Sequence, residues 1–293
     1  MASKSNVAPL IAIVGETASG KTALAIKLAK QFNGEIIAAD SRTVYKGLTI
    51  GTAKPTPQER AGIRHHLLDV VAPNESFTVA DFKRLAEAAI TDITNRGKLP
   101  ILVGGTGLYV DAVLYDFTFA AAPDPQLRQE LQTLSVPELQ KLIQDRGIAM
   151  PENKQNSRHL IRTIERNGEM PKRRDLRPNT LIIGLSIERE ELRQKISQRI
   201  DEMISHGLID ETRRAWQTYG AVPALQAPAY KAFGAYLDGK CTLEEAKVLF
   251  ARSDLQLAKR QRTWFKRNKS IHWVHKQAEA VDLATTFLNK YYL

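Results

Sequence analysis

The chain has 293 residues, of which 43% are hydrophobic and 25% charged, and it carries a formal net charge of +10 at pH 7. These values fit one large or two small soluble domains with a hydrophobic core, and the basic balance favours phosphate or nucleic-acid ligands. The single cysteine, Cys241, excludes internal disulfides and cysteine-based zinc fingers. No apolar run is long enough to span a membrane, and the amino-terminal segment lacks the apolar core of a signal peptide, so we expect a cytoplasmic protein without membrane association.

The first third of the chain alternates between strand-like and helix-like segments. Apolar runs predict strands over residues 10–15, 35–40, 65–71 and 99–105. Helical periodicity predicts helices over residues 21–32, 77–97 and 106–116. This alternation predicts a parallel sheet that is covered by helices on both faces.

The pattern changes after Asp116, where prolines separate polar, helix-like pieces as far as Pro178. An apolar strand returns over residues 181–187, and the remainder is mainly helical and ends with a short apolar strand over 271–275. We therefore expect an α/β core interrupted by a small, mainly helical inserted domain. The expected parts are residues 1–117 and 180–293 for the core and residues 118–179 for the insertion.

The segment GETASGKT fits the pattern G-x-x-x-x-G-K-[ST] and lies between a predicted strand and a predicted helix, which is the context that the motif requires. Gly15 and Gly20 let the backbone curl, so that its amides converge on phosphate oxygens. Lys21 adds a positive charge, and Thr22 offers a hydroxyl to Mg²⁺. The core therefore resembles P-loop NTPases. The predicted diphosphate-binding residues are Gly15, Thr17, Ala18, Ser19, Gly20, Lys21 and Thr22.

The phosphate loop alone does not identify its ligand, since ATP, GTP and other diphosphates fit it equally well. The base-reading N-K-x-D segment of GTPases is absent. Asp40, at the end of the second predicted strand, fits the metal-binding acid of an ATPase as well as a catalytic base. A small-molecule kinase that uses ATP and an RNA-binding NTPase without transfer chemistry therefore remain open.

Further segments occur in the order and approximate spacing of one family. They are GETASGKT, ADSRTVYKGLTIGTAKP, HHLLDV, FTVADF, LVGGTGLY and LAKRQRTWF. In these segments the chain resembles tRNA dimethylallyltransferases, also called isopentenyl-tRNA transferases, and it lacks a C-terminal zinc finger as the bacterial form does. The resemblance implies transfer of a dimethylallyl group from dimethylallyl diphosphate, with Mg²⁺, to N6 of the adenine on the 3′ side of the tRNA anticodon. A close relative, the adenine-nucleotide isopentenyltransferase, remains an alternative.

The resemblance also assigns catalytic roles to Asp40, Thr106 and Lys21. Asp40 would be the general base that accepts the proton of N6, and the Thr106 hydroxyl would lie near the bridging oxygen of the donor. Lys21 would stabilise the charge that develops on the leaving diphosphate. The alternative for Asp40 is that it caps the following helix or holds a metal-bound water. The alternative for Thr106 is that it is an ordinary N-cap.

Two basic zones favour RNA as the partner. Arg158, Arg162 and Arg166 repeat at every fourth position and so share one helix face, and a second zone covers residues 252–269. We expect a monomer that holds the anticodon stem-loop. The residues predicted to bind tRNA are Asp40, Ser41, Arg42, Thr43, Arg158, Arg162, Tyr230, Lys231, Lys259, Arg260 and Arg262.

Four positions depart from the pattern of the family: Thr43, His159, Ala229 and Leu255 stand where it more often has Gln, Arg, Gly and Arg. They bear on the tRNA contacts rather than on the donor site. Leu257 and Trp264, two turns apart, are expected to pack into the core. His65 and His66 are adjacent in a strand and point to opposite faces, so a structural role is favoured over a metal site.

Overall fold

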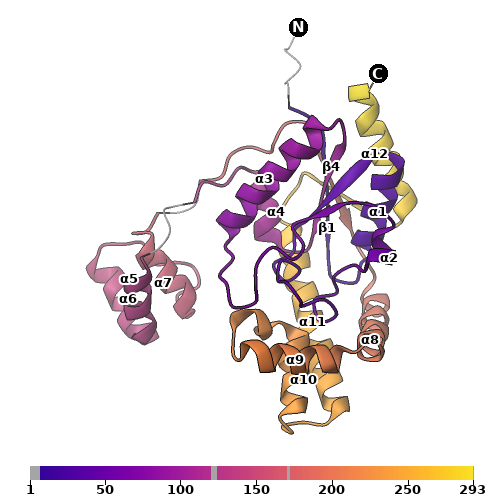
Figure 1. Ribbon diagram of the computed structural model, residues 1–293. Helices are drawn as coiled ribbons and strands as arrows, with labels where there is room; N and C mark the ends of the chain where they lie inside the picture. Colours follow the sequence, from indigo (N-terminus) through magenta and orange to yellow (C-terminus); the bar gives the residue numbers. More distant parts are fainter. Residues whose placement is uncertain (1–6, 120–123, 170–171, 293) are drawn as a thin grey trace. The chain divides into compact units, whose positions relative to one another are not determined.

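The computed structural model describes residues 7–119, 124–169 and 172–292 (Figure 1). The chain forms two compact units: the first combines residues 1–114 with 176–293, and the second is Tyr115–Asp175. The second unit overlaps the segment 118–179 that we expect to be an insertion. Residues 1–6, part of the segment that lacks signal-peptide character, and Pro123, one of the separating prolines, lie outside the described residues.

A six-stranded parallel sheet forms the centre of the first unit, with the strand order β3-β2-β4-β1-β5-β6. The sheet and the α/β class that the sequence predicts are thereby confirmed. All residues of the central strand β1 are buried, as expected where helices cover both faces. The strands are β1 (Leu10–Gly15), β2 (Gly34–Ala38), β3 (His65–His66), β4 (Leu99–Gly104), β5 (Thr180–Leu185) and β6 (Ile271–Val274).

Helices α1 (Lys21–Gln31) and α12 (Gln277–Tyr292) pack on one face of this sheet, where they share an apolar core with β1, β4 and β5. Helices α3 (Val79–Asn95) and α4 (Gly107–Leu114) lie on the other side (Figure 1). The short helix α2 (Pro57–Arg60) follows β2. These layers place the carboxyl ends of the strands at one edge, which is where ligands bind in such sheets.

The rest of the first unit is helical and has a core of its own. It comprises α8 (Arg189–Ser205), α9 (Leu208–Tyr219), the 3₁₀ helix η1 (Pro223–Gln226), α10 (Pro228–Leu237) and α11 (Leu243–Phe265). Ile196, Ile200, Phe233 and Phe250 lie in the buried cluster that joins α8, α10 and α11. Because α11 also contacts β1 and α4, it brings its polar side chains to the edge of the sheet.

The second unit contains α5 (Pro125–Thr133), α6 (Val136–Asp145) and α7 (Ser157–Glu165). Leu131, Leu139 and Ile143 form a buried cluster with the apolar face of α7. Arg158 and Arg162 lie on α7 and are exposed, as expected for an amphipathic helix with one apolar face.

Three expectations about the elements are wrong. The third strand spans only residues 65–66, because Leu67 and Asp69 have positive φ angles of 64° and 55° and the chain leaves the sheet. The strand over 271–275 is not the last element, because the chain continues after β6 into the helix α12. Trp264 is 37% exposed and its indole donates to Asp111 Oδ2 at 2.9 Å instead of packing into the core.

Glu35, at the start of β2, is a buried carboxylate held by three basic side chains. It accepts from Arg96 Nη2 at 2.7 Å and from Lys98 Nζ at 2.8 Å, and His66 Nε2 lies 2.8 Å away. The hydrogen bonds from Arg96 hold the pKa of Glu35 well below its usual range. This contact gives His66 the structural role that the sequence favours.

We expect Glu35→Gln to lower the free energy of unfolding by about 2 kcal/mol at pH 7, since charge-assisted bonds are lost. A carboxyl whose folded pKa is lowered contributes stability above its unfolded pKa, and this contribution is lost as the pH falls below that value. The difference in the free energy of unfolding between wild type and variant, measured by urea unfolding, should therefore decrease below about pH 4. A gap that is the same at pH 7 and in acid would contradict the assignment, and Glu87→Gln on exposed α3 surface is the matched control.

Candidate functional site

A cavity of about 240 Å³ lies at the carboxyl edge of the sheet, within the first unit. Part of its lining comes from the phosphate loop and the start of α1, and another part comes from the segment after β2, namely from Asp40, Thr43, Thr52, Ala53 and Pro55. The apolar part of the lining consists mainly of Ala25, Ile36, Ala38, Leu68 and Val103. The cavity therefore combines an anion-binding wall, a carboxylate and an apolar interior.

The phosphate loop has the curled backbone that its sequence predicts. Gly15 has a φ angle of 142°, and a Cβ there would lie 2.5 Å from the carbonyl oxygen of Leu185, so no side chain fits. The amide of Ser19 donates to the carbonyl of Glu16 at 3.3 Å, and Lys21 Nζ donates to the same carbonyl. Lys21 and Thr22 open α1 and line the cavity, where the helix N-terminus favours an anion.

Lys21 is the loop residue with the most perturbed charge. The pKa of Lys21 is lowered to about 8: burial is the largest cause and Arg199 acts in the same direction, whereas Asp40 and Glu16 act in the opposite direction. The cavity thus holds two cations and a carboxylate close enough to influence one another. An anionic ligand between the cations would relieve their mutual repulsion.

Side chains from α8 and α11 hold the loop at Thr17. Arg199 Nη1 donates to Thr17 Oγ1 at 3.0 Å, and Gln261 Oε1 accepts the amide of Thr17 at 2.8 Å. A second nitrogen of Arg199, Nη2, pairs with buried Asp254. Within the described part of the chain, the buried Nε of Arg199 and the buried Oγ of Ser19 have no hydrogen-bond partner. Such orphaned polar atoms are expected where a polar ligand binds.

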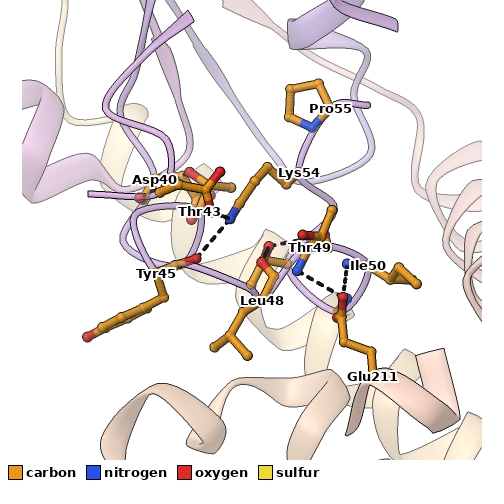
Figure 2. Close-up of polar contacts among 12 residues, drawn as sticks. Asp40, Thr43, Tyr45, Leu48, Thr49, Ile50, Lys54, Pro55 and Glu211 are labelled. Atoms are coloured by element: carbon orange, nitrogen blue, oxygen red, sulfur yellow. Dashed lines mark hydrogen bonds and ion pairs between the residues drawn. The ribbon is translucent and has the colours of Figure 1, made fainter. Parts of the chain in front are cut away.

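Asp40 follows β2 and lines the same cavity as the phosphate loop. Its Oδ1 accepts the amide of Arg42 at 2.7 Å, and its carbonyl lies 3.5 Å from the hydroxyl of Thr43. The short turn fixes the carboxylate, and Figure 2 shows Asp40 and Thr43 beside Lys54. A fixed and partly accessible carboxylate in a cavity has the placement of a general base.

Thr106 lies between β4 and α4 and contacts the segment that follows Asp40. Its Oγ1 accepts the amide of Ser41 at 3.0 Å and lies 3.5 Å from the hydroxyl of Ser41. Its carbonyl accepts the amides of Tyr109 and Val110. The hydroxyl of Thr106 thus ties the two loops together, and a contact with the donor stays a prediction.

The residues predicted to bind tRNA fall into three groups: exposed cations, the segment that begins at Asp40, and two side chains that contact buried carboxylates. Arg158, Arg162, Lys231, Lys259 and Arg260 are exposed and are therefore available to RNA. Asp40, Ser41 and Arg42 are half-buried, and Thr43 is 7% exposed but lines the cavity.

The prediction that Tyr230 contacts tRNA does not fit the structure. Tyr230 is fully buried, and its hydroxyl donates to Glu211 Oε1 at 2.7 Å, so it has no surface to offer an RNA. Arg262 is half-buried and donates from Nη2 to Glu16 Oε2 at 3.0 Å and to the carbonyl of Ile187 at 3.2 Å. It braces the phosphate loop in this structure, and a role in RNA binding stays a prediction.

Arg199, Gln261 and Glu211 support the site or its flanking segment, and the sequence does not predict them. Arg199 lies in an ordinary amphipathic helix, and its sequence surroundings carry no signal for a site. Gln261 lies inside LAKRQRTWF, where the three neighbouring cations favour RNA binding and nothing marks the glutamine as a contact of the phosphate loop. Each reaches the site only through the packing of a distant helix.

The donor set in the cavity fits Mg²⁺ only together with a substrate. Thr22 and Asp40 both line the cavity, but within residues 7–119, 124–169 and 172–292 no group of three His, Cys, Asp or Glu side chains is placed to hold a metal ion. Mg²⁺ commonly binds one or two protein oxygens, waters and substrate phosphates. Thr22 and the phosphates of a bound donor match that coordination.

Comparison with known proteins gives one consistent result. The family model described as IPP transferase matches residues 43–268. The tRNA dimethylallyltransferase of Anoxybacillus flavithermus is 44% identical over 277 residues, which cover 90% of this chain and 89% of that protein. No helix of the described residues is both long and apolar enough to cross a membrane.

Solved structures resemble this one over nearly its whole length. The tRNA isopentenylpyrophosphate transferase of Bacillus halodurans superimposes with a TM-score of 0.75 at 39% identity and covers 96% of this chain and 97% of that one. A eukaryotic dimethylallyltransferase acting on tRNA gives a TM-score of 0.85 at 27% identity, covering 97% of this chain and 80% of that one. The six-segment resemblance in the sequence is thereby confirmed.

Proposed function

The chain belongs to the IPP transferase family, and from that premise we propose that it transfers a dimethylallyl group from dimethylallyl diphosphate to N6 of the adenine on the 3′ side of the tRNA anticodon. The observation that carries the proposal is that residues of the phosphate loop, Asp40 and a set of apolar side chains line the same cavity. The relatives named above are tRNA-modifying transferases, which favours this reaction over a small-molecule kinase or an NTPase without transfer chemistry.

The diphosphate of the donor would bind at the phosphate loop. The amides at the start of α1, the ammonium of Lys21 and the guanidinium of Arg199 supply positive charge to one place. Arg199, which already contacts Thr17, is the arginine best placed to reach the donor phosphates. Mg²⁺ held by Thr22 and the phosphates would supply further charge neutralisation. The apolar depth of the cavity suits the five-carbon chain.

Transfer breaks the bond between C1 of the donor and the bridging oxygen and forms a bond from C1 to N6. The electron pair of the broken bond leaves with the diphosphate, where Lys21 and Arg199 stabilise it. N6 loses a proton as the new bond forms, and the carboxylate of Asp40 accepts it. The base must leave its stack to reach this cavity.

The tRNA would be held by exposed cations and read at the target nucleotide by the segment after Asp40. Arg158 and Arg162 in the second unit, and Lys231, Lys259 and Arg260 in the first, are exposed and suit phosphate contacts. An adenine-nucleotide transferase would need no such surface, so a competition between tRNA and AMP as acceptors separates the two.

We expect tRNA binding to weaken steeply with salt. Neutralising about five phosphates gives a slope of about −3.5 to −4.5 when the logarithm of the binding constant is plotted against that of the salt concentration. Filter binding or fluorescence anisotropy from low to high salt measures this slope. Arg158→Ala should reduce its magnitude by nearly one, whereas Arg146→Ala, on exposed surface of the same unit, is the control. A flat dependence would mean that the cations do not contact RNA.

A further inference from the structure

Glu211 on α9 is a buried carboxylate that accepts four hydrogen bonds, three from the turn Thr49–Gly51 and one from Tyr230. Its Oε2 accepts the amides of Thr49 at 3.0 Å and Ile50 at 2.9 Å. Its Oε1 accepts the amide of Gly51 at 2.9 Å and the hydroxyl of Tyr230 at 2.7 Å. Figure 2 shows Glu211 reaching from its helix to the backbone of this turn.

The arrangement is costly unless every bond is made. Glu211 is 7% exposed and Tyr230 is fully buried, so a missing partner would leave a buried charge uncompensated. Burial raises the pKa of Tyr230, and nearby Glu211 raises it further, so the hydroxyl keeps the proton that it donates. A Cβ on Gly51 would lie 2.6 Å from the Tyr230 ring, which shows how closely the ring packs against the turn.

The turn leads directly into one wall of the cavity. Thr52, Ala53 and Pro55 line that wall. The far end of the segment is fixed by Lys54, whose Nζ donates to the carbonyl of Tyr45 at 2.8 Å and to Asp69 Oδ1 at 2.6 Å (Figure 2). The wall is therefore held at one end by Glu211 and at the other by Lys54.

We propose that Glu211 is a positioning residue for the acceptor: it holds the segment Thr49–Pro55, and with it the side of the cavity that receives the nucleobase of the RNA. This inference rests on the proposed function. The diphosphate is assigned to the part of the lining made by residues 17, 18 and 20–22, and Asp40 lies on the same continuous segment as Thr52 and Pro55. Glu211 touches neither substrate and acts through the backbone that it orders.

The test compares Glu211→Gln with Tyr230→Phe. Glutamine places an amide NH₂ where one carboxylate oxygen accepts two hydrogen bonds, so at least two donors lose their acceptor. We expect kcat/KM for tRNA to fall about 10²-fold, the size of effect that misplaced reacting groups produce. The KM for dimethylallyl diphosphate and the Kd of a non-reactive thiolodiphosphate analogue should stay unchanged. Tyr230→Phe removes one bond of four and should give the same selective loss at about tenfold or less.

Asp210→Asn, at the adjacent and exposed position of α9, is the matched control and should behave as wild type. Donor affinity that falls in step with tRNA turnover in either variant would overturn the proposal, and so would wild-type turnover in Glu211→Gln. If Glu211→Gln does not fold, the selective loss in Tyr230→Phe decides the matter. Absence of transfer by the wild-type chain would instead contradict the proposed function, so the two failures are distinguishable.

Discussion

Replacing Asp40 by asparagine should lower kcat for prenyl transfer by about 10² to 10⁴-fold, the contribution expected of a positioned general base. Asparagine has the same shape and its oxygen can still accept the amide of Arg42, a contact that measures 2.7 Å in wild type. It cannot accept the proton that N6 releases. Single-turnover transfer to unmodified tRNA measures the loss, and binding of the non-reactive donor analogue should be unchanged.

The control for Asp40→Asn is Asp282→Asn, on the exposed surface of α12. It should transfer at the wild-type rate. Retained turnover in Asp40→Asn would show that the carboxylate is not the base. A parallel loss of donor affinity would instead give Asp40 a role in binding the metal or the donor.

Lys21→Met should weaken binding of the donor and lower kcat/KM by about 10²-fold or more, since the ammonium faces the charge that develops on the leaving diphosphate. Burial lowers the pKa of Lys21 to about 8, which means that the surrounding protein disfavours the charged form. Removing that ammonium should therefore leave the melting temperature unchanged or raise it. Weaker donor binding together with an unchanged or higher melting temperature distinguishes a loss of function from misfolding.

Calorimetric titration with inorganic diphosphate and a thermal melt on the same sample measure both quantities for Lys21→Met. Lys30→Met, at an exposed position of the same helix, is the control. Undiminished diphosphate binding by Lys21→Met would contradict the assignment of the phosphate loop.

The phosphate loop and most of the sheet could be predicted because their signals are local. Gly15, Gly20 and Lys21 lie within one short segment, and apolar runs such as 10–15 and 99–105 become buried strands. Asp40 follows such a run, so its place at the sheet edge also followed from the pattern. The third strand was overestimated because two residues, Leu67 and Asp69, adopt positive φ angles that hydropathy does not reveal.

The supports of the site could not be predicted because they come from helices far away in the sequence. Arg199 and Gln261 reach Thr17 from α8 and α11, and the packing of those helices decides which of their polar residues point inward. The prediction that Tyr230 contacts tRNA fails for the same reason, because the packing of α9 and α10 turns its hydroxyl toward buried Glu211. Only the tertiary structure shows what this side chain contacts.

The most direct test incubates the wild-type chain with dimethylallyl diphosphate, Mg²⁺ and an unmodified tRNA that has adenine on the 3′ side of its anticodon. Mass spectrometry of the digested RNA then locates any modification. We expect a gain of one C₅H₈ unit on that adenine alone, with release of diphosphate. An RNA of unchanged mass, or a gain on another nucleotide, would contradict it.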